Sequence, residues 1–567
     1  MISAICLMKK VYFLSFAFAF FSANASAQFT RYIVRFKDKA GTPNTINNPL
    51  QFLSAKAIAR RARQNIAIDE TDLPISPRYI DSVRLAGNVT ILDQSKWLNQ
   101  VCIQTTDATA LAKINSMSFV INSQPLMRPA NAPAAVGNKF NEEIDSITTS
   151  QAVNNILDFY NYGNSYAQIH IHEGEYLHDK GFHGEGMLMA ILDAGFYHYL
   201  TLPAFDSARN NNQVIETYDY VANEISVDED HSHGMQCFSI IGGNMPGQLV
   251  GSCPKANFYL YRTEDASRES PVEEQYWAAA AERADSIGVD VISTSLGYTQ
   301  FDNPVFNHTY ADMNGNTTII ARAADLAAKK GMIVVVAAGN DGAGTWHFIS
   351  TPADADSVLT VGAVNASGIV AGFSSFGPSA DGQVKPSVAS VGVSTAISST
   401  AGTIVAGNGT SFATPNMAGL VTCLWQAFPD FTNMEIIQAV IKSSSIYDAP
   451  NDRIGYGIPN FHKAFDDLNQ QKILRNINAI LGNNRIKIFP NPFTNNFNIV
   501  INPQHTAIAT FNLYDALGRL YVSKKVSLQE GQVQFLKFEN LQPLQKGIYT
   551  LKFSDGQSKQ SFKLAVQ

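Results

Sequence analysis

Short apolar runs alternate with helical patterns between about residue 150 and residue 468, and this alternation constrains the fold more than any other feature of the chain. Five runs, each bounded by Gly, Asp or Asn, cover residues 187–193, 256–261, 289–293, 332–338 and 358–364. Helical patterns lie between them at 272–287 and 319–330. The alternation predicts an α/β domain with a parallel sheet covered by helices on both faces, with functional residues at the carboxyl ends of the strands.

Length and composition narrow the classes of protein to which this chain can belong. A chain of 567 residues is too long for one compact core, so we expect two to four domains. Five cysteines are too few for a small disulfide scaffold, and 45% hydrophobic with 16% charged residues excludes global disorder. The formal net charge of −7 offers no general attraction to nucleic acid.

Residues 1–27 are typical of a secretory signal peptide. Lys9 and Lys10 precede an apolar run at 11–21, and Ala25-Ser26-Ala27 supplies small residues at a cleavage point. The run is short of the ~20 residues that span a bilayer. We therefore expect secretion and no stable membrane span.

Changes of pattern along the chain predict further boundaries. Residues 28–128 mix strand-like runs with a basic helical stretch at 54–63, which favours a small α+β unit. Residues 129–150 are typical of a flexible, exposed linker. The helical signal disappears after about residue 470, so we expect a second linker at 469–483 and a small all-β sandwich at 484–567.

Three segments of the middle domain carry the side chains of nucleophilic acyl transfer. Asp193 ends an apolar strand, His233 begins a helical run, and Ser411 lies in the first turn of a later helix. A serine hydroxyl needs a base, and the base needs a group that fixes its tautomer. A helix N-terminus directs backbone N–H groups at the oxyanion that forms during attack, and Asn340 at the end of another strand can donate a second hydrogen bond.

Taken singly, these motifs have ordinary structural explanations as a strand end, a helix cap or a turn. Together and in this order they resemble the four hallmark motifs of the subtilisin-like serine proteases (subtilases). The motifs are Asp193-Ala194-Gly195, Ser232-His233-Gly234, Ala338-Gly339-Asn340 and Gly409-Thr410-Ser411-Phe412-Ala413-Thr414-Pro415. The resemblance implies a subtilisin-like peptidase domain at 151–468.

The resemblance also implies a role for each matching residue. Ser411 would be the nucleophile, His233 the general base and acid, Asp193 its orienting carboxylate, and Asn340 the oxyanion donor together with the Ser411 amide. The cleft would be lined by Ser295, Leu296 and Gly297 on one wall and by Ala338 and Gly339 on the other. The floor of the primary pocket would lie near residues 345–350, which leave the preferred side chain undetermined.

The cysteines that remain after processing are expected to be largely structural. Cys237 lies one helical turn after His233, and by analogy with some relatives we expect it to pack beneath the imidazole. Three cysteines, Cys237, Cys253 and Cys423, cannot all pair internally. We expect at least one buried thiol, and a Cys237–Cys253 bridge stays open.

The flanking units carry resemblances of their own. Residues 28–128 resemble the inhibitor and chaperone propeptide that precedes many subtilases, with a permanently retained domain as the alternative. Residues 484–567 resemble the C-terminal sorting domain of the type IX (Por) secretion system of Bacteroidota, with a carbohydrate- or protein-binding sandwich as the alternative. These resemblances imply a zymogen, type IX machinery as a partner, and a location outside the cell or on the outer-membrane surface once the signal peptide and C-terminal domain are removed.

The sequence thus predicts a secreted serine endopeptidase that hydrolyses peptide bonds in protein or peptide substrates through an acyl-enzyme on Ser411. A non-catalytic surface adhesin on the same fold is the alternative. A specialised processing or peptide-ligating protease would differ only in acceptor and substrate range. We expect no cofactor, and although structural calcium is compatible with the chain, the Asp and Glu positions assign no calcium site.

Overall fold

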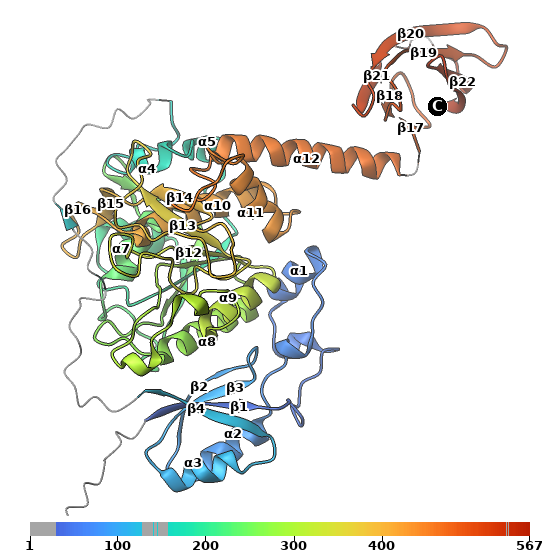
Figure 1. The fold of residues 1–567 in the computed structure, drawn as a ribbon. Coiled ribbons are helices and arrows are strands. Elements are labelled where there is room, and N and C mark those ends of the chain that lie inside the picture. Colours follow the sequence, from blue (N-terminus) through green and yellow to red (C-terminus); the bar gives the residue numbers. More distant parts are fainter. Residues whose placement is uncertain are drawn as a thin grey trace, which may run out of the picture.

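A computed structural model describes residues 30–127, 140, 144–145, 157–482, 484–539, 541 and 544–567 (Figure 1). The predicted signal peptide lies outside these residues, as does most of the linker predicted at 129–150. In the described part of the chain, no helix is both long and apolar enough to cross a membrane.

The middle of the molecule is a parallel sheet of seven strands in the order β14-β13-β12-β11-β6-β10-β7. Its strands are β6 (Leu188–Asp193), β7 (Val214–Asp219), β10 (Asn257–Arg262), β11 (Val291–Thr294), β12 (Ile333–Ala337), β13 (Leu359–Val364) and β14 (Val388–Val391). The five predicted apolar runs are all strands of this sheet. The two edge strands, β7 and β14, were not predicted, because β7 is only half apolar and β14 has four residues.

Helices cover both faces of the sheet, as predicted (Figure 1). Along β12, Ile333 and Val335 point into the core on the side of α7 (His233–Gly242) and α10 (Thr410–Ala427). Val334 and Val336 point into the core on the side of α8 (Val272–Ile287) and α9 (Ile319–Lys329). A strand buried on both faces needs apolar residues at every position, which explains the unbroken run.

Shorter elements complete this domain. They are α4 (Tyr166–His170), α5 (Glu175–Asp179), α6 (Asp206–Asn210), α11 (Asn433–Lys442), β8 (Asn244–Met245), β9 (Leu249–Val250), β15 (Thr395–Ser398) and β16 (Ile404–Gly407). The two-residue strand β5 (Ile144–Asp145) joins β15 and β16 as the third strand of a small sheet. This small sheet is where the predicted linker meets the domain.

The N-terminal unit is an antiparallel sheet in the order β2-β3-β1-β4. Its elements are β1 (Arg31–Phe36), α2 (Pro77–Arg84), β2 (Thr90–Ser95), β3 (Gln100–Gln104), α3 (Ala108–Asn115) and β4 (Val120–Met127). The basic stretch predicted at 54–63 forms α1 (Ala55–Arg63), which lies against α8 of the central domain in Figure 1. The second helix, α2, was not predicted.

Helix α1 brings two arginines into a buried cluster of charges. Nη2 of Arg60 lies 2.5 Å from Oδ1 of Asp285, and Nη2 of Arg61 lies 2.8 Å from Oδ2 of the same carboxylate. Arg61 also pairs with Asp72 at 2.6 Å, and Lys330 Nζ pairs with Asp72 at 3.0 Å. All five side chains are at most 1% exposed. Buried charges of this kind need partners, and the two domains supply them jointly, although Nε and Nη1 of Arg61 are buried with no hydrogen-bond partner among the described residues.

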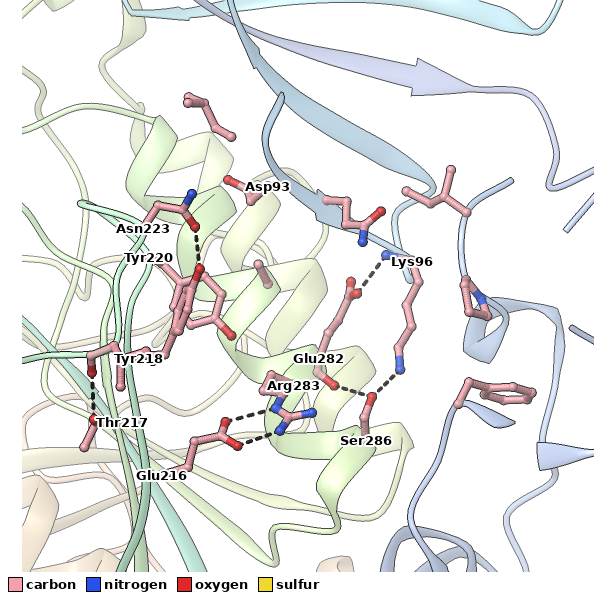
Figure 2. Close-up of a pocket in the computed structure, with 17 residues that line it drawn as sticks. Asp93, Lys96, Glu216, Thr217, Tyr218, Tyr220, Asn223, Glu282, Arg283 and Ser286 are labelled. Carbon is pink, nitrogen blue, oxygen red and sulfur yellow. Dashed lines mark hydrogen bonds and ion pairs between the residues drawn. The ribbon is translucent and has the colours of Figure 1, made fainter. Parts of the chain in front are cut away.

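A cavity of about 750 Å³ separates β2 from α8 (Figure 2). At its edge Glu282 of α8 reaches the N-terminal unit, where it accepts hydrogen bonds from Ser95 Oγ at 2.5 Å and from the backbone N–H groups of Lys96 and Trp97 at 2.7 and 3.0 Å. Burial nonetheless raises the pKa of Glu282 to about 7.

Asp93 of β2 lines the same cavity and is partly buried. Its Oδ1 accepts a hydrogen bond from Gln275 of α8 at 2.6 Å, whereas its Oδ2 is buried with no partner among the described residues. Burial raises the pKa of this carboxyl group to about 7. Docking of the N-terminal unit therefore places two carboxyl groups, Asp93 of the unit and Glu282 of α8, in surroundings that disfavour their negative charge.

The C-terminal part departs from the prediction at its start. Helix α12 (Phe461–Leu481) continues through the stretch expected to be a linker, so the predicted loss of helix after about residue 470 is wrong. The stretch lacks a strong apolar face but is rich in good helix formers such as Leu, Gln, Lys and Arg. Among the side chains of this stretch that the structure describes, Leu481 is buried.

The sandwich predicted at 484–567 is present as two packed sheets, β17-β18-β21 and β20-β19-β22-β23. Its strands are β17 (Ile486–Phe489), β18 (Phe497–Ile501), β19 (Ala507–Tyr514), β20 (Leu520–Leu528), β21 (Gln534–Phe538), β22 (Gly547–Ser554) and β23 (Lys559–Val566). Inward side chains of both sheets form a separate apolar core. In Figure 1 this domain lies at the far end of α12, away from the central sheet.

Candidate active site

Asp193 and His233 meet where β6 ends and α7 begins. Asp193 is the last residue of β6, and His233 is the first residue of α7. His233 Nδ1 lies 2.6 Å from Asp193 Oδ1, and both side chains are at most 1% exposed. The carboxylate can only accept, so Nδ1–H donates, which fixes the tautomer and leaves Nε2 as the basic nitrogen.

Gly234 allows this close approach of helix to strand. A Cβ atom at Gly234 would lie 2.5 Å from the carbonyl oxygen of Gly195 and 2.7 Å from Cβ of Asp193. Any other residue would push α7 away from the end of β6 and lengthen the Asp193–His233 hydrogen bond. The His-Gly dipeptide therefore has a packing reason as well as a chemical one.

Ser411 is the second residue of α10, and neighbouring groups fix its backbone. Ser295 Oγ donates a hydrogen bond to the Ser411 carbonyl oxygen at 2.8 Å, and Cys237 Sγ donates to the same oxygen at 3.4 Å. The ring of Phe412 lies 6.1 Å from that of His233, which places the first turn of α10 beside the imidazole. The expectation that Pro415 falls in the first turn is wrong: it is the sixth residue of α10, and because it has no N–H to donate to the Ser411 carbonyl, that oxygen is available to Ser295 and Cys237.

Asn340 is held by the same helical turn. It follows β12, and its Oδ1 accepts hydrogen bonds from the backbone N–H and the hydroxyl of Thr410, both at 2.9 Å. Because the amide oxygen of Asn340 accepts hydrogen bonds from α10, its NH₂ group is the part that can donate hydrogen bonds to another group. All four motifs thus converge at the carboxyl ends of β6 and β12 and the N-termini of α7 and α10.

The two predicted walls of the cleft face each other across Ser350. A Cβ atom at Gly297 would collide with the Ser350 hydroxyl, and one at Gly339 would lie 3.1 Å from the same oxygen. Leu296 and Ala338 are buried in the core beneath the walls, and Ser295 binds Ser411 as described. Ser350, at the end of the stretch predicted to form the floor, is the residue that the sequence alone did not single out.

Phe140 is a further side chain at this site that sequence reasoning missed. Its ring stacks on His233 with centroids 4.4 Å apart and on His231 with centroids 4.9 Å apart. Ile144 pairs with Gly407 of β16, four residues before Ser411. The expectation that this linker is simply exposed fails for Phe140, which is partly buried. An isolated Phe between polar residues was the available signal.

The cysteines of the described chain, Cys102, Cys237, Cys253 and Cys423, are all buried free thiols. The open possibility of a Cys237–Cys253 bridge is therefore not realised in this structure. Ligand atoms of Cys237, His233 and Asp193 lie within 4.8 Å of one another, so the thiol is beside the pair, as expected. The 2.6 Å separation of His233 from Asp193 is that of a hydrogen bond and leaves no room for an ion between them.

Comparison with known proteins agrees with this geometry. The subtilase family profile matches residues 184–457. Subtilisin NAT of Bacillus subtilis subsp. natto is 30% identical over 293 residues, which cover 51% of this chain and 68% of that protein. The chain belongs to the subtilase family.

The chain is also similar to other known proteins. Subtilisin E of Bacillus subtilis (strain 168) is 30% identical over 293 residues, covering 51% of this chain and 68% of that protein. Subtilisin Savinase of Lederbergia lenta is 27% identical over 288 residues, covering 51% of this chain and 93% of that protein. A crystal structure of MycP1 with the N-terminal propeptide removed has 23% identity and a TM-score of 0.42, covering 53% of this chain and 96% of that one.

The flanking domains of this subtilase also match known families. Residues 31–142 match the peptidase S8 propeptide domain of Bacteroidota, and residues 487–567 match the secretion system C-terminal sorting domain. The N-terminal unit is therefore a propeptide, and the protein is made as a zymogen. The sorting domain indicates a destination outside the cell or on the outer-membrane surface.

Proposed function

We propose that this subtilase is a secreted serine endopeptidase in which Ser411 is the nucleophile, His233 the general base and acid, and Asp193 the residue that orients His233. Asn340 and the Ser411 amide donate hydrogen bonds to the oxyanion. The backbone of Ser295, Leu296 and Gly297 and of Ala338 and Gly339 lines the substrate cleft, while the side chains of Leu296 and Ala338 pack into the core. The mechanism uses no cofactor.

The reaction proceeds in two acyl-transfer steps. His233 Nε2 takes the proton of Ser411 Oγ as the oxygen attacks the substrate carbonyl carbon, and the imidazolium then gives that proton to the departing amine. Water, deprotonated by the same nitrogen, attacks the acyl-enzyme, and its proton returns to Ser411 as the acid leaves. Oxyanion donors matter most in each addition, because negative charge appears on the former carbonyl oxygen.

The observation that carries this proposal is the buried 2.6 Å hydrogen bond between His233 and Asp193. A buried imidazole tied to a carboxylate at one nitrogen becomes a directed base at the other. The second support is the position of Ser411 at the N-terminus of α10, where backbone N–H groups lack intrahelical partners. A non-catalytic adhesin would require neither arrangement.

Labelling with a fluorophosphonate probe tests the assignment. We expect the secreted wild-type protein to lose casein hydrolysis as one probe molecule attaches to Ser411. In subtilisin, to which this chain is similar, loss of the serine or the histidine costs about 10⁶ in kcat. We expect the same scale for Ser411→Ala, with Ser367→Ala on an exposed turn as the matched control. Labelling that persists in Ser411→Ala would refute the role of this residue.

Type IX machinery is the partner that we propose for export. The match of residues 487–567 to a secretion sorting domain supports this step. Protein substrates would then be met outside the cell, after the propeptide has been removed. We also propose that the propeptide is removed by the enzyme itself. A Ser411→Ala chain would then keep residues 28–128, whereas wild type would lose them.

A further inference from the structure

A second cavity lies between the propeptide and the catalytic domain, with a volume of about 400 Å³. The propeptide contributes Arg35 of β1 and part of β4, and the catalytic domain contributes Arg322 of α9 and part of the loop before that helix. None of its lining residues belongs to the cavity of Figure 2, which lies between β2 and α8. Each domain thus places one arginine at this cavity.

The two guanidinium groups have no acidic partner among the described residues. Nε of Arg35 donates a hydrogen bond to the neutral Gln100 Oε1 at 3.2 Å. The Arg322 guanidinium forms no hydrogen bond or ion pair with any residue that the structure describes. Burial lowers the pKa of Arg322, and the nearby charge of Arg35 lowers it further. An arginine keeps its proton in a protein, so two positive charges remain side by side.

The carboxylate that also lines this cavity, Glu274, is already engaged by other groups. Its Oε1 lies 2.8 Å from His308 Nε2, and its Oε2 accepts hydrogen bonds from the backbone N–H groups of Ile319 and Ile320 at 2.9 and 3.2 Å. Glu274 acts on Arg322 from a distance and raises its pKa in part, but the net shift stays downward. Positive charge is therefore in excess at the cavity.

We propose that Arg35 and Arg322 form a binding site for a tetrahedral oxyanion, phosphate or sulfate, which exists only while the propeptide is docked. The bound anion bridges the two domains and favours the docked precursor. The inference goes beyond the proposed function, because it concerns the precursor and not the reaction at Ser411.

The chemistry of the guanidinium group fits this ligand. Its planar fork donates two parallel hydrogen bonds to an oxyanion, and such charge-assisted bonds are stronger than neutral ones. A tetrahedral anion has enough oxygen atoms to accept bonds from both arginines at once. Without an anion, the two like charges repel each other across the interface. The sign of the contribution of Arg322 to docking therefore depends on the anion.

Calorimetric titration of inorganic phosphate into the full-length Ser411→Ala precursor tests the site, with chloride keeping the ionic strength constant. We expect one phosphate to bind, and sulfate to compete with it. Arg322→Gln and Arg35→Gln should each weaken binding by about 10-fold or more, because each removes hydrogen bonds to a charged group. Arg78→Gln is the matched control, since Arg78 is an exposed arginine of α2 outside the cavity, and it should bind phosphate like the parent.

Urea unfolding of the same proteins separates anion binding from a structural role of Arg322. Phosphate should raise the urea midpoint of the parent, because a ligand stabilises the state that binds it. It should leave the midpoint of Arg322→Gln unchanged. In chloride alone this variant should unfold at the same urea concentration as the parent or a higher one, since the repulsion is gone. A purely structural arginine would instead give a lower midpoint in the variant with and without phosphate.

Absence of phosphate binding by the parent, or equal affinity in the parent and both variants, overturns the proposal. An equal rise of the midpoint in the parent and Arg322→Gln also overturns it, because the rise is then a general effect of the salt. Should Arg322→Gln fail to fold, Arg35→Gln and the parent titration still decide. None of these outcomes affects the endopeptidase function, which casein hydrolysis tests separately.

Discussion

The two domains that flank the catalytic domain are attached to it in opposite ways. The propeptide shares a buried charge cluster with it, in which Arg60 and Arg61 of α1 both pair with Asp285 of α8. The sorting domain instead follows α12 and packs on the end of that helix through β17 and β18. In Figure 1 the first flank lies against the central domain and the second stands apart from it.

This difference indicates which role each flanking domain can have, in stability or in export. A domain held by buried charges and backbone hydrogen bonds changes the stability of what it binds, and its removal leaves charges uncompensated. A domain on a helical tether can serve as an address without affecting the fold of its cargo. The predictions below test each half of the contrast.

The largest loss of unfolding free energy is expected from Asp285→Asn in the Ser411→Ala precursor. The change leaves Arg60 and Arg61 buried beside a neutral amide, and removing one partner of a buried ion pair typically costs about 3–5 kcal/mol. Urea unfolding followed by circular dichroism measures the loss. Arg283→Gln, on the same helix α8, breaks a more exposed ion pair with Glu216 of β7 and should cost under about 1 kcal/mol. Equal costs for the two variants would mean that the buried cluster does not hold the propeptide.

A smaller change in the stability of the precursor is expected when the pH is raised. Burial raises the pKa values of Asp93 and Glu282 to about 7 in the docked precursor, whereas free carboxyl groups titrate near 4. Docking therefore takes up protons, so its stabilising contribution is complete below about pH 4 and is lost as pH rises through about 7. We expect the urea midpoint of the Ser411→Ala precursor to fall between pH 5 and pH 8.

Asp93→Asn should flatten this pH dependence, because the amide cannot take up a proton. Asp81→Asn, a change at an exposed residue of α2, is the matched control and should leave the slope unchanged. A steeper slope in Asp93→Asn, or a midpoint that rises with pH in the parent, would contradict the assignment of proton uptake to this interface.

The smallest effect on stability is expected from deleting 484–567. Because this domain packs on the end of α12, the unfolding free energy of the rest should change by about 0.5 kcal/mol or less, the scale of surface changes. Its cellular effect should be large, since the shortened enzyme should stay in the periplasm. Urea unfolding measures the first effect, and cell fractionation with a casein assay measures the second. A shortened protein that is exported normally would remove the sorting role.

The sequence predicted five of the seven strands of the central sheet because the signals of these five are local. Each of the five runs is mainly apolar, and Asp193, His233, Asn340 and Ser411 each lie near an element boundary that the pattern marks. What it missed depends on contacts between distant parts of the chain. Arg60 and Arg61 look like surface charges until Asp285 is known to face them, and nothing near Phe140 in the sequence indicates two imidazoles.

The linker predicted at 469–483 is wrong for a different reason, because α12 continues through it. Its first two turns bury Phe461, Ala464 and Leu468 at helical spacing in the central core, whereas its later turns bury few side chains and depend more on residue propensity. The catalytic roles themselves came from the order of four motifs, because no single motif determines chemistry.

The shared cluster around Asp285 also determines what maturation does to the outer surface of the enzyme. Loss of the propeptide takes away both guanidinium groups and exposes Asp285 and Glu282, together with Asp290, which loses Lys56. Asp285 at the end of α8 and Asp290 just after it thus lose their cationic partners, and this surface becomes more negative even though Lys330 stays behind. Precursor and mature forms should separate on an anion exchanger, and basic proteins should adhere to the mature form more readily.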